Sequence, residues 1–258
     1  MHRRHFLATV GGAATASGSQ PPAPKSKFRF YTLDYFYLKN GTQLGRIHEF
    51  LSKAWLPAIG PLHAGPKIVL EALVAPHMPQ VVVLCGYESF EQIERMRSKA
   101  FAKPEFKKAF EDWEAGEEAP YEQMTSVLLE LAAYSPEVDT SAAPPKNPRV
   151  FELRVYHSPT VRQLRALHER FAGPEIRIFQ RVGVRPILYT STYFGPHSPN
   201  LTYLIPFDDL AAREKAWSAF AADPEWIKVR KESIDKHGQI SSVIQIALYR
   251  AAPYSPIR

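Results

Sequence analysis

A short segment in the second half of the chain alternates charged and aromatic residues with apolar ones. Glu152, Arg154 and Tyr156 occupy every second position of the stretch from Val150 to Tyr156, which has the composition of a strand. Alternate residues of a strand share a face, so these three side chains would project together. A charged pair beside a phenol in a mostly apolar cavity can orient a small polar ligand.

Three further residues complete this candidate ligand-binding face. Asp34 lies on the corresponding strand 120 residues earlier, and Tyr189 and Tyr203 lie on strands that we expect beside it. The competing interpretation is structural: Arg154 pairs with Asp34 or with Glu152 and closes the core. Ion-pair networks of this kind are common, so the sequence favours the structural interpretation over a binding or catalytic one.

Four histidines are candidates for acid–base chemistry or for holding a metal or haem. His77 and His197 recur in two proline-flanked turns, and His48 and His168 each precede a glutamate on an expected helix. No second ligand stands at metal-binding spacing from the turn histidines, and no C-x-x-C-H motif supports haem. We therefore expect no metal site and no cofactor. Haem ligation by His48 or His168 remains an alternative to simple packing at the helix–sheet boundary.

The composition argues against several classes of function. The 258 residues carry a net charge of +6, but the basic residues are scattered, without the clustered patch of a nucleic-acid groove. The motifs G-x-S-x-G, G-x-x-x-x-G-K, H-E-x-x-H and G-x-G-x-x-G are missing, so acyl transfer, phosphate cradling and zincin chemistry lack support. The single cysteine, Cys85, cannot form an intramolecular disulfide, and we expect it to be a small buried hydrophobe.

The N-terminus has the features of a twin-arginine export signal. Arg3-Arg4-His5-Phe6-Leu7 fits R-R-x-F-L, and Ala14-Thr15-Ala16 fits a small-x-small cleavage site after a short Gly/Ala-rich stretch. That stretch is too short to span a bilayer permanently. We expect residues 1–27 to be a signal peptide and spacer, and the folded protein to be periplasmic or secreted.

An internal repeat sets the architecture of the remaining chain. The segment from Ala75 to Phe106 recurs as Gly195 to Trp226 at an offset of 120 residues without a gap, with nine identities in 32 positions. Strand and helix patterns in each copy follow the order β-α-β-β-α-β, the split βαβ or ferredoxin-like pattern. We expect two such repeats, at 28–134 and 149–256, joined by a proline-rich linker at 135–148.

The two repeats should share one core. A ferredoxin-like sheet carries helices on one face only, so two sheets in tandem can close on each other into a barrel. The predicted fold class is α+β, with two ferredoxin-like repeats as the single-chain equivalent of a dimer. We expect the apolar positions of the first strands to face the helices and the mixed positions to face the space between the sheets. The apolar set is Tyr31, Leu33, Tyr35, Phe151, Leu153 and Val155, and the mixed set is Thr32, Asp34, Phe36, Glu152, Arg154 and Tyr156.

The second repeat resembles a known family. Its opening, Phe151-Glu152-Leu153-Arg154-Val155-Tyr156, is similar to the (Y/F)-E-L-R-x-Y opening of NIPSNAP domains. The similarity continues through Pro199-Asn200-Leu201-Thr202-Tyr203-Leu204 and Trp217 to Asp223-Pro224-Glu225-Trp226. In the first repeat, Thr32 replaces the glutamate and Asp34 the arginine. The resemblance covers nearly all of residues 28–256 and implies a dimeric α/β-barrel fold, but no settled activity.

Barrels of this kind include cofactor-free monooxygenases, ring-degrading enzymes and haem proteins, so the resemblance leaves three functional hypotheses. The first is an exported NIPSNAP-type barrel that binds a small molecule or a protein partner, and a homo-oligomer is compatible with it. The second is a cofactor-free oxygenase or isomerase that uses Glu152, Arg154 and Tyr156. The third is a haem protein that uses His168 or His48. We expect no nucleic-acid partner and no stable membrane span.

Overall fold

The computed structural model of the protein describes residues 26–143 and 145–258, so the predicted signal peptide lies outside the described residues. The first repeat contains β1 (Phe30–Tyr37), α1 (Gln43–Phe50), a π-helical segment (Leu51–Trp55), α2 (Leu56–Ile59), β2 (Lys67–Val74), β3 (Gln80–Tyr87), α3 (Phe90–Phe101), α4 (Pro104–Glu114) and β4 (Gln123–Leu131). The second contains β5 (Val150–His157), α5 (Val161–Arg170), a π-helical segment (Phe171–Glu175), α6 (Ile176–Val182), β6 (Leu188–Phe194), β7 (Asn200–Phe207), α7 (Leu210–Ala222), α8 (Pro224–His237) and β8 (Val243–Ala251).

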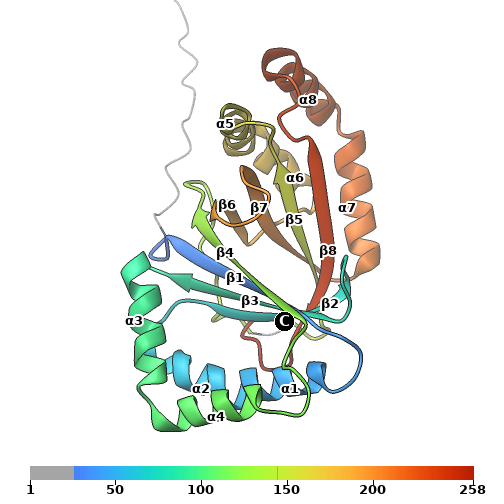
Figure 1. Cartoon of the computed structure of the whole chain (residues 1–258). Coiled ribbons are helices and arrows are strands. Elements are labelled where there is room, and N and C mark those ends of the chain that lie inside the picture. Colours follow the sequence, from blue (N-terminus) through green and yellow to red (C-terminus); the bar gives the residue numbers. More distant parts are fainter. Residues whose placement is uncertain (1–25, 144) are drawn as a thin grey trace, which may run out of the picture.

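The strands close into one eight-stranded barrel in the order β1-β3-β2-β8-β5-β7-β6-β4. Within each repeat the first strand pairs with the third and the last, as the ferredoxin-like pattern requires. The repeats join at two antiparallel seams, β2 with β8 and β4 with β6. The helices of each repeat cover its own side of the barrel, so α1–α4 and α5–α8 lie far apart (Figure 1). The predicted α+β fold, with two repeats closed into a barrel, is confirmed.

The prediction of which strand face looks inward is wrong. Leu33 and Leu153 point into the barrel and pack in one cluster with side chains from both repeats. Phe36 instead packs with residues of α1 and α4, and Tyr156 packs with residues of α5 and α6. Both faces of β5 are largely buried, so the alternation of residue types along the strand does not distinguish the barrel side from the helix side.

The segment that follows each repeat's last strand crosses onto the other repeat. After β4, the Tyr134 hydroxyl hydrogen-bonds His168 Nδ1 at 2.7 Å, and Ser135 Oγ accepts a hydrogen bond from the backbone N–H of Tyr189 at 3.0 Å. Residues 120 positions later repeat both contacts: Tyr254 with His48 at 2.6 Å, and Ser255 with the Val69 N–H at 3.1 Å. These reciprocal contacts tie the two repeats into one unit.

Candidate functional site

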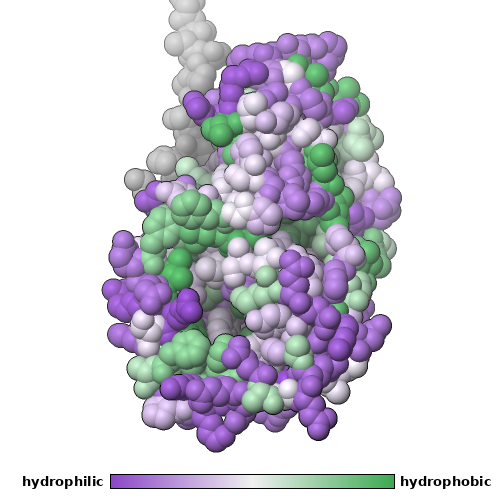
Figure 2. Space-filling model, viewed as in Figure 1, coloured by the Kyte–Doolittle hydropathy of each residue, from purple (hydrophilic) through white to green (hydrophobic). Residues whose placement is uncertain are grey.

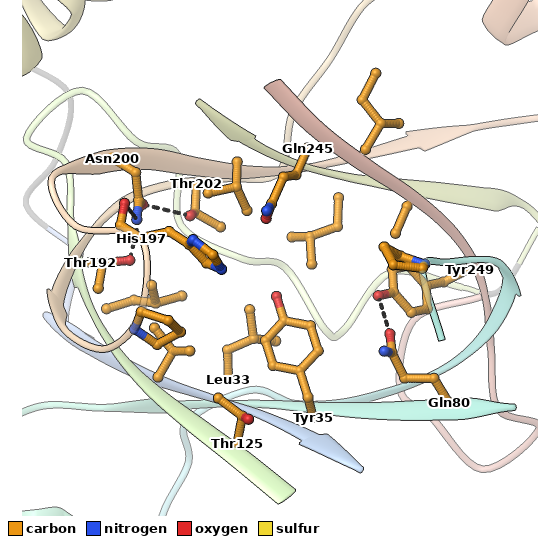
Figure 3. A pocket seen from close by; sticks show the side chains of 18 of the residues that line it. Leu33, Tyr35, Gln80, Thr125, Thr192, His197, Asn200, Thr202, Gln245 and Tyr249 are labelled. Carbon is orange, nitrogen blue, oxygen red and sulfur yellow. Dashed lines mark hydrogen bonds between the residues drawn. The ribbon is translucent and has the colours of Figure 1, made fainter. Parts of the chain in front are cut away.

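The barrel encloses a cavity of about 240 Å³. Side chains from β1, β3, β4 and all the strands of the second repeat line it, together with the strand–strand turns that hold Pro76 and Pro196. Leu33 lies in the middle of the wall, with Asn200 near one end and Gln80 near the other (Figure 3). The cavity wall is therefore largely apolar, with polar groups at both ends and Tyr35, Thr125 and Gln245 between them.

One end of the cavity is organised around Asn200, which is 1% exposed. Its Oδ1 accepts hydrogen bonds from the hydroxyls of Thr192 at 2.9 Å and Thr202 at 3.0 Å, and its Nδ2 donates to the His197 carbonyl at 2.9 Å. The hydroxyl protons of Thr192 and Thr202 are therefore both used in hydrogen bonds to Asn200. The threonine oxygens keep lone pairs, so this end of the cavity can accept hydrogen bonds from a ligand.

The opposite end presents donors. The Tyr249 hydroxyl donates to Gln80 Oε1 at 2.7 Å, which leaves the Nε2 protons of Gln80 for another acceptor. The hydroxyl of Tyr35 projects into the space between the two ends (Figure 3). Burial is the main cause that raises the pKa of both the Tyr35 and the Tyr249 phenol. Both phenols stay protonated near neutral pH and can donate.

The two turn histidines, which the repeat pairs, have different environments. The His77 ring donates from Nε2 to the Leu38 carbonyl at 2.7 Å and packs edge-on against Tyr37. His197 adopts a left-handed backbone conformation with φ 64°, and its ring borders the cavity (Figure 3). Histidine is among the non-glycine residues that tolerate this conformation. Only the second-repeat histidine can therefore contact a molecule in the cavity.

The predicted Glu152–Arg154 pair lies on the helix side of β5, outside the cavity. Glu152 is fully buried and binds the Nε of Arg154 through Oε1. Its Oε2 accepts from Arg213 Nε at 2.5 Å and from Trp217 Nε1 at 3.0 Å, both on α7. The Arg154 guanidinium stacks 3.6 Å from the centre of the Trp217 ring. The pair faces the helices because α7 supplies the donors that a buried carboxylate needs.

The other predicted site residues are also on the helix side. Three of them, Tyr156, Tyr189 and Tyr203, pack in one aromatic cluster beneath the second-repeat helices. The centroid of the Tyr203 ring lies 5.2 Å from that of Tyr156 and 5.7 Å from that of Tyr189. Asp34 lies opposite Ser126 on the helix side of β1, where burial raises the pKa of its carboxyl. Among the described ion pairs Arg154 joins Glu152 and not Asp34. The six residues of the predicted ligand-binding face therefore lie in a packing layer on the helix side and do not line the cavity.

The two helix histidines have both ring nitrogens hydrogen-bonded. His48 contacts Tyr254 through Nδ1 and Glu71 through Nε2 at 3.0 Å. His168 contacts Tyr134 and, through Nε2, the Ser191 hydroxyl at 2.7 Å. Ligation of haem iron by either ring would break one of these bonds. Within residues 26–143 and 145–258 no cluster of three or more His, Cys, Asp or Glu is placed to hold a metal ion.

Apart from His197, sequence reasoning missed the polar residues that line the cavity. The repeat aligns Gln80 with Asn200 and Thr125 with Gln245, and all four border the cavity. This equivalence is the signal that could have found them, because equivalent strand positions of the two repeats face the same interior of a closed barrel. None of the helices in the described part of the chain is long and apolar enough to cross a membrane.

Comparison with known proteins agrees with this architecture. Residues 151–256 match the NIPSNAP family model. The comparison with curated proteins found no match. Among solved structures, an anthrone oxidase-like protein aligns over 87% of this chain and 91% of its own, with a TM-score of 0.56 and 16% identity.

Two further solved structures, both of proposed monooxygenases, share the fold. The one from Lactobacillus acidophilus covers 87% of this chain and 94% of its own, with a TM-score of 0.52 and 7% identity. The one from Fusobacterium nucleatum covers 87% and 92%, with a TM-score of 0.53 and 10% identity. At such identities the likeness establishes the fold and not the activity. Residues 151–256, in the second repeat, thus match the NIPSNAP family, and the whole chain shares its closed-barrel fold with these solved structures.

Proposed function

We propose that the barrel cavity binds a small, uncharged and largely apolar molecule with polar groups at its two ends. The lining supports this most directly: leucine and valine side chains form much of the wall, and its hydrogen-bonding groups, at the ends and between them, carry no formal charge. No Asp, Glu, Lys or Arg occurs among the described residues that line the cavity. A charged ligand would lose its hydration there without gaining an ionic partner.

The hydrogen-bonding pattern gives the ligand a direction. The end at Thr192 and Thr202 offers lone pairs, because both hydroxyl protons are held by Asn200. The end at Gln80 offers amide protons, because Tyr249 already occupies its oxygen. A molecule with a donor at one end and an acceptor at the other fits this arrangement.

Native mass spectrometry of the protein purified from its own host tests the proposal, with a pair of adjacent substitutions. Ala247→Phe would place a ring in the cavity, whereas Leu248→Phe would place the same ring on the outer face of β8. We expect the unmodified protein and Leu248→Phe to retain a small molecule, and Ala247→Phe to retain at least about tenfold less, because overfilling a packed site displaces its occupant. Equal retention by the two variants, or no retained mass in any sample, would contradict the proposal.

A second candidate function is catalysis at the same cavity, with His197 as a base toward the bound molecule. The specific observation is its left-handed backbone, a conformation that costs about 1–3 kcal/mol and concentrates at functional sites. The names of the structurally similar oxidase-like and monooxygenase proteins agree with such chemistry. His197→Gln should then abolish turnover of the retained molecule and leave its binding intact. Unchanged turnover in this variant would remove His197 as the base.

We also propose that the folded chain is exported by the twin-arginine route, because Arg3 and Arg4 stand in an R-R-x-F-L context. Replacement of both arginines by lysine should retain the protein in the cytoplasm when cells are fractionated. Export of this variant at the normal level would refute the proposal.

A further inference from the structure

Exposed large apolar side chains gather on the outer face of the barrel where β4 meets β6. Phe194 is 67% exposed, Tyr193 44% and Phe90 37%. The Tyr193 ring centroid lies 4.9 Å from that of Phe194 and 5.3 Å from that of Phe90, and Phe194 pairs with Leu128 across the seam. We call Phe90, Leu128, Tyr193 and Phe194 the β4–β6 patch. Figure 2 shows hydrophobic side chains gathered across the middle of the face on which β4 lies.

The second seam of the barrel carries an equivalent apolar surface. Val74 pairs with Leu248 where β2 meets β8, at the positions 120 residues from Phe194 and Leu128. Val74 is 61% exposed, Ile244 47% and Ile246 41%. We call Val74, Ile244, Ile246 and Leu248 the β2–β8 patch. Helices cover the sheets of both repeats but leave these seams bare, so each patch is a candidate contact surface.

The charges at the edges of the two patches differ. Beside the β4–β6 patch, Arg29 and Glu130 form an ion pair at 2.6 Å, with side chains 65% and 33% exposed. The equivalent positions beside the β2–β8 patch hold two arginines, Arg149 and Arg250. In a twofold contact the same surface meets its own copy. A rim with one cation and one anion is complementary to itself, whereas a rim with two cations repels itself.

We infer that the β4–β6 patch is a dimerisation surface that receives the same patch of a second copy of this chain. Three of its four residues are aromatic, in agreement with the enrichment of aromatic residues in interface cores. Arg29 of each copy would stand near Glu130 of the other at the rim. The barrel itself is already closed within one chain, so this dimer would differ from one that forms the barrel. The inference does not depend on what the cavity binds.

Matched substitutions at the two seams test this inference. Phe194→Asp places a charge in the β4–β6 patch, and Val74→Asp places the same charge at the equivalent position of the β2–β8 patch. We expect the full chain and Val74→Asp to be dimers in sedimentation equilibrium, and Phe194→Asp to dissociate with a Kd raised at least about thirtyfold, as for an interface hot spot. Circular dichroism and melting temperature should be unchanged, because both sites are exposed.

Charge reversal at the rim gives a second and independent readout. Glu130→Arg alone should weaken the dimer, and the double variant Arg29→Glu with Glu130→Arg should restore it, because the exchanged pair is again complementary to its own copy. A monomeric full chain at tens of micromolar, or a dimer that Val74→Asp breaks and Phe194→Asp does not, would overturn the inference. If the double variant did not regain dimerisation, Arg29 and Glu130 would not contribute to the dimer contact.

Discussion

Glu152 shows how a residue suited to ligand chemistry can serve packing instead. It is fully buried and receives hydrogen bonds from Arg154 on its own strand and from Arg213 and Trp217 on α7. A buried carboxylate is tolerated only while such donors surround it, and loss of one leaves a charge without compensation. The E-L-R sequence at the start of the segment that matches the NIPSNAP family therefore fixes how β5 and α7 pack in this protein.

This role makes a prediction at the residue scale. Arg154→Leu should lower the free energy of unfolding by about 3–5 kcal/mol, because the buried Glu152 carboxyl loses its ionic partner and Trp217 loses the stacked guanidinium. Denaturant unfolding measures the loss, and Arg162→Leu, on an exposed position of α5, is the control. The folded fraction of Arg154→Leu should still retain the cavity ligand. If Arg154→Leu had normal stability but no longer retained the ligand, Arg154 would have to be part of the binding site.

At the scale of elements, the crossing segments after β4 and β8 explain why the two repeats behave as one unit. Ser135 and Ser255 are both 3% exposed, and each accepts a hydrogen bond from a backbone N–H of the opposite repeat. Their neighbours Tyr134 and Tyr254 hold the helix histidines of that repeat. A buried N–H that has no hydrogen-bond partner destabilises the fold by the full free energy of removing that group from water.

The serines therefore provide a symmetric test. Ser135→Ala and Ser255→Ala should each reduce the free energy of unfolding by about 1–3 kcal/mol, because each strands a backbone donor. Hydrogen exchange should be faster at the Tyr189 amide in the first variant and at the Val69 amide in the second. Ser98→Ala, at an exposed position of α3, should change neither quantity. Faster exchange confined to the mutated residue's own repeat would contradict the crossed arrangement.

At the scale of the molecule, one cluster of apolar side chains packs inside the barrel around the cavity and draws on both repeats. Leu33 and Leu70 from the first repeat pack there with Phe151 and Leu153 from the second. Neither sheet can bury this face alone, since its partner sheet provides the other half of the layer. Unfolding should therefore be a single cooperative transition.

Leu153→Ala checks this cooperativity. We expect a loss of about 2–5 kcal/mol from the enlarged cavity, as for other buried leucines. Buried amides of β3 in the first repeat and of β7 in the second should exchange through global unfolding. Their exchange rates should rise by the same factor in this variant. Acceleration in β7 alone, or two transitions in calorimetry, would show that the repeats unfold separately.

Much of this architecture could be read from the sequence because the signals are local and occur twice. The repeat of Ala75–Phe106 at Gly195–Trp226, with alternating strands and capped helices, is enough to give the element order and the ferredoxin-like units. Ser89 and Asp209 do cap α3 and α7, by accepting hydrogen bonds from the N–H groups of Gln92 and Ala212. Closure into a barrel follows, because each sheet has one face without helices.

The tertiary structure alone decided which strand face lines the cavity and which histidine reaches it. Period-two alternation identifies the two faces of β5. It does not show which face lines the barrel, because helices bury one face and the partner sheet buries the other. The repeat likewise gives His77 and His197 the same turn, yet His77 is held by the Leu38 carbonyl while His197 borders the cavity. These choices depend on partners distant in sequence, such as Arg213 and Trp217 on α7, and only the folded chain brings them to β5.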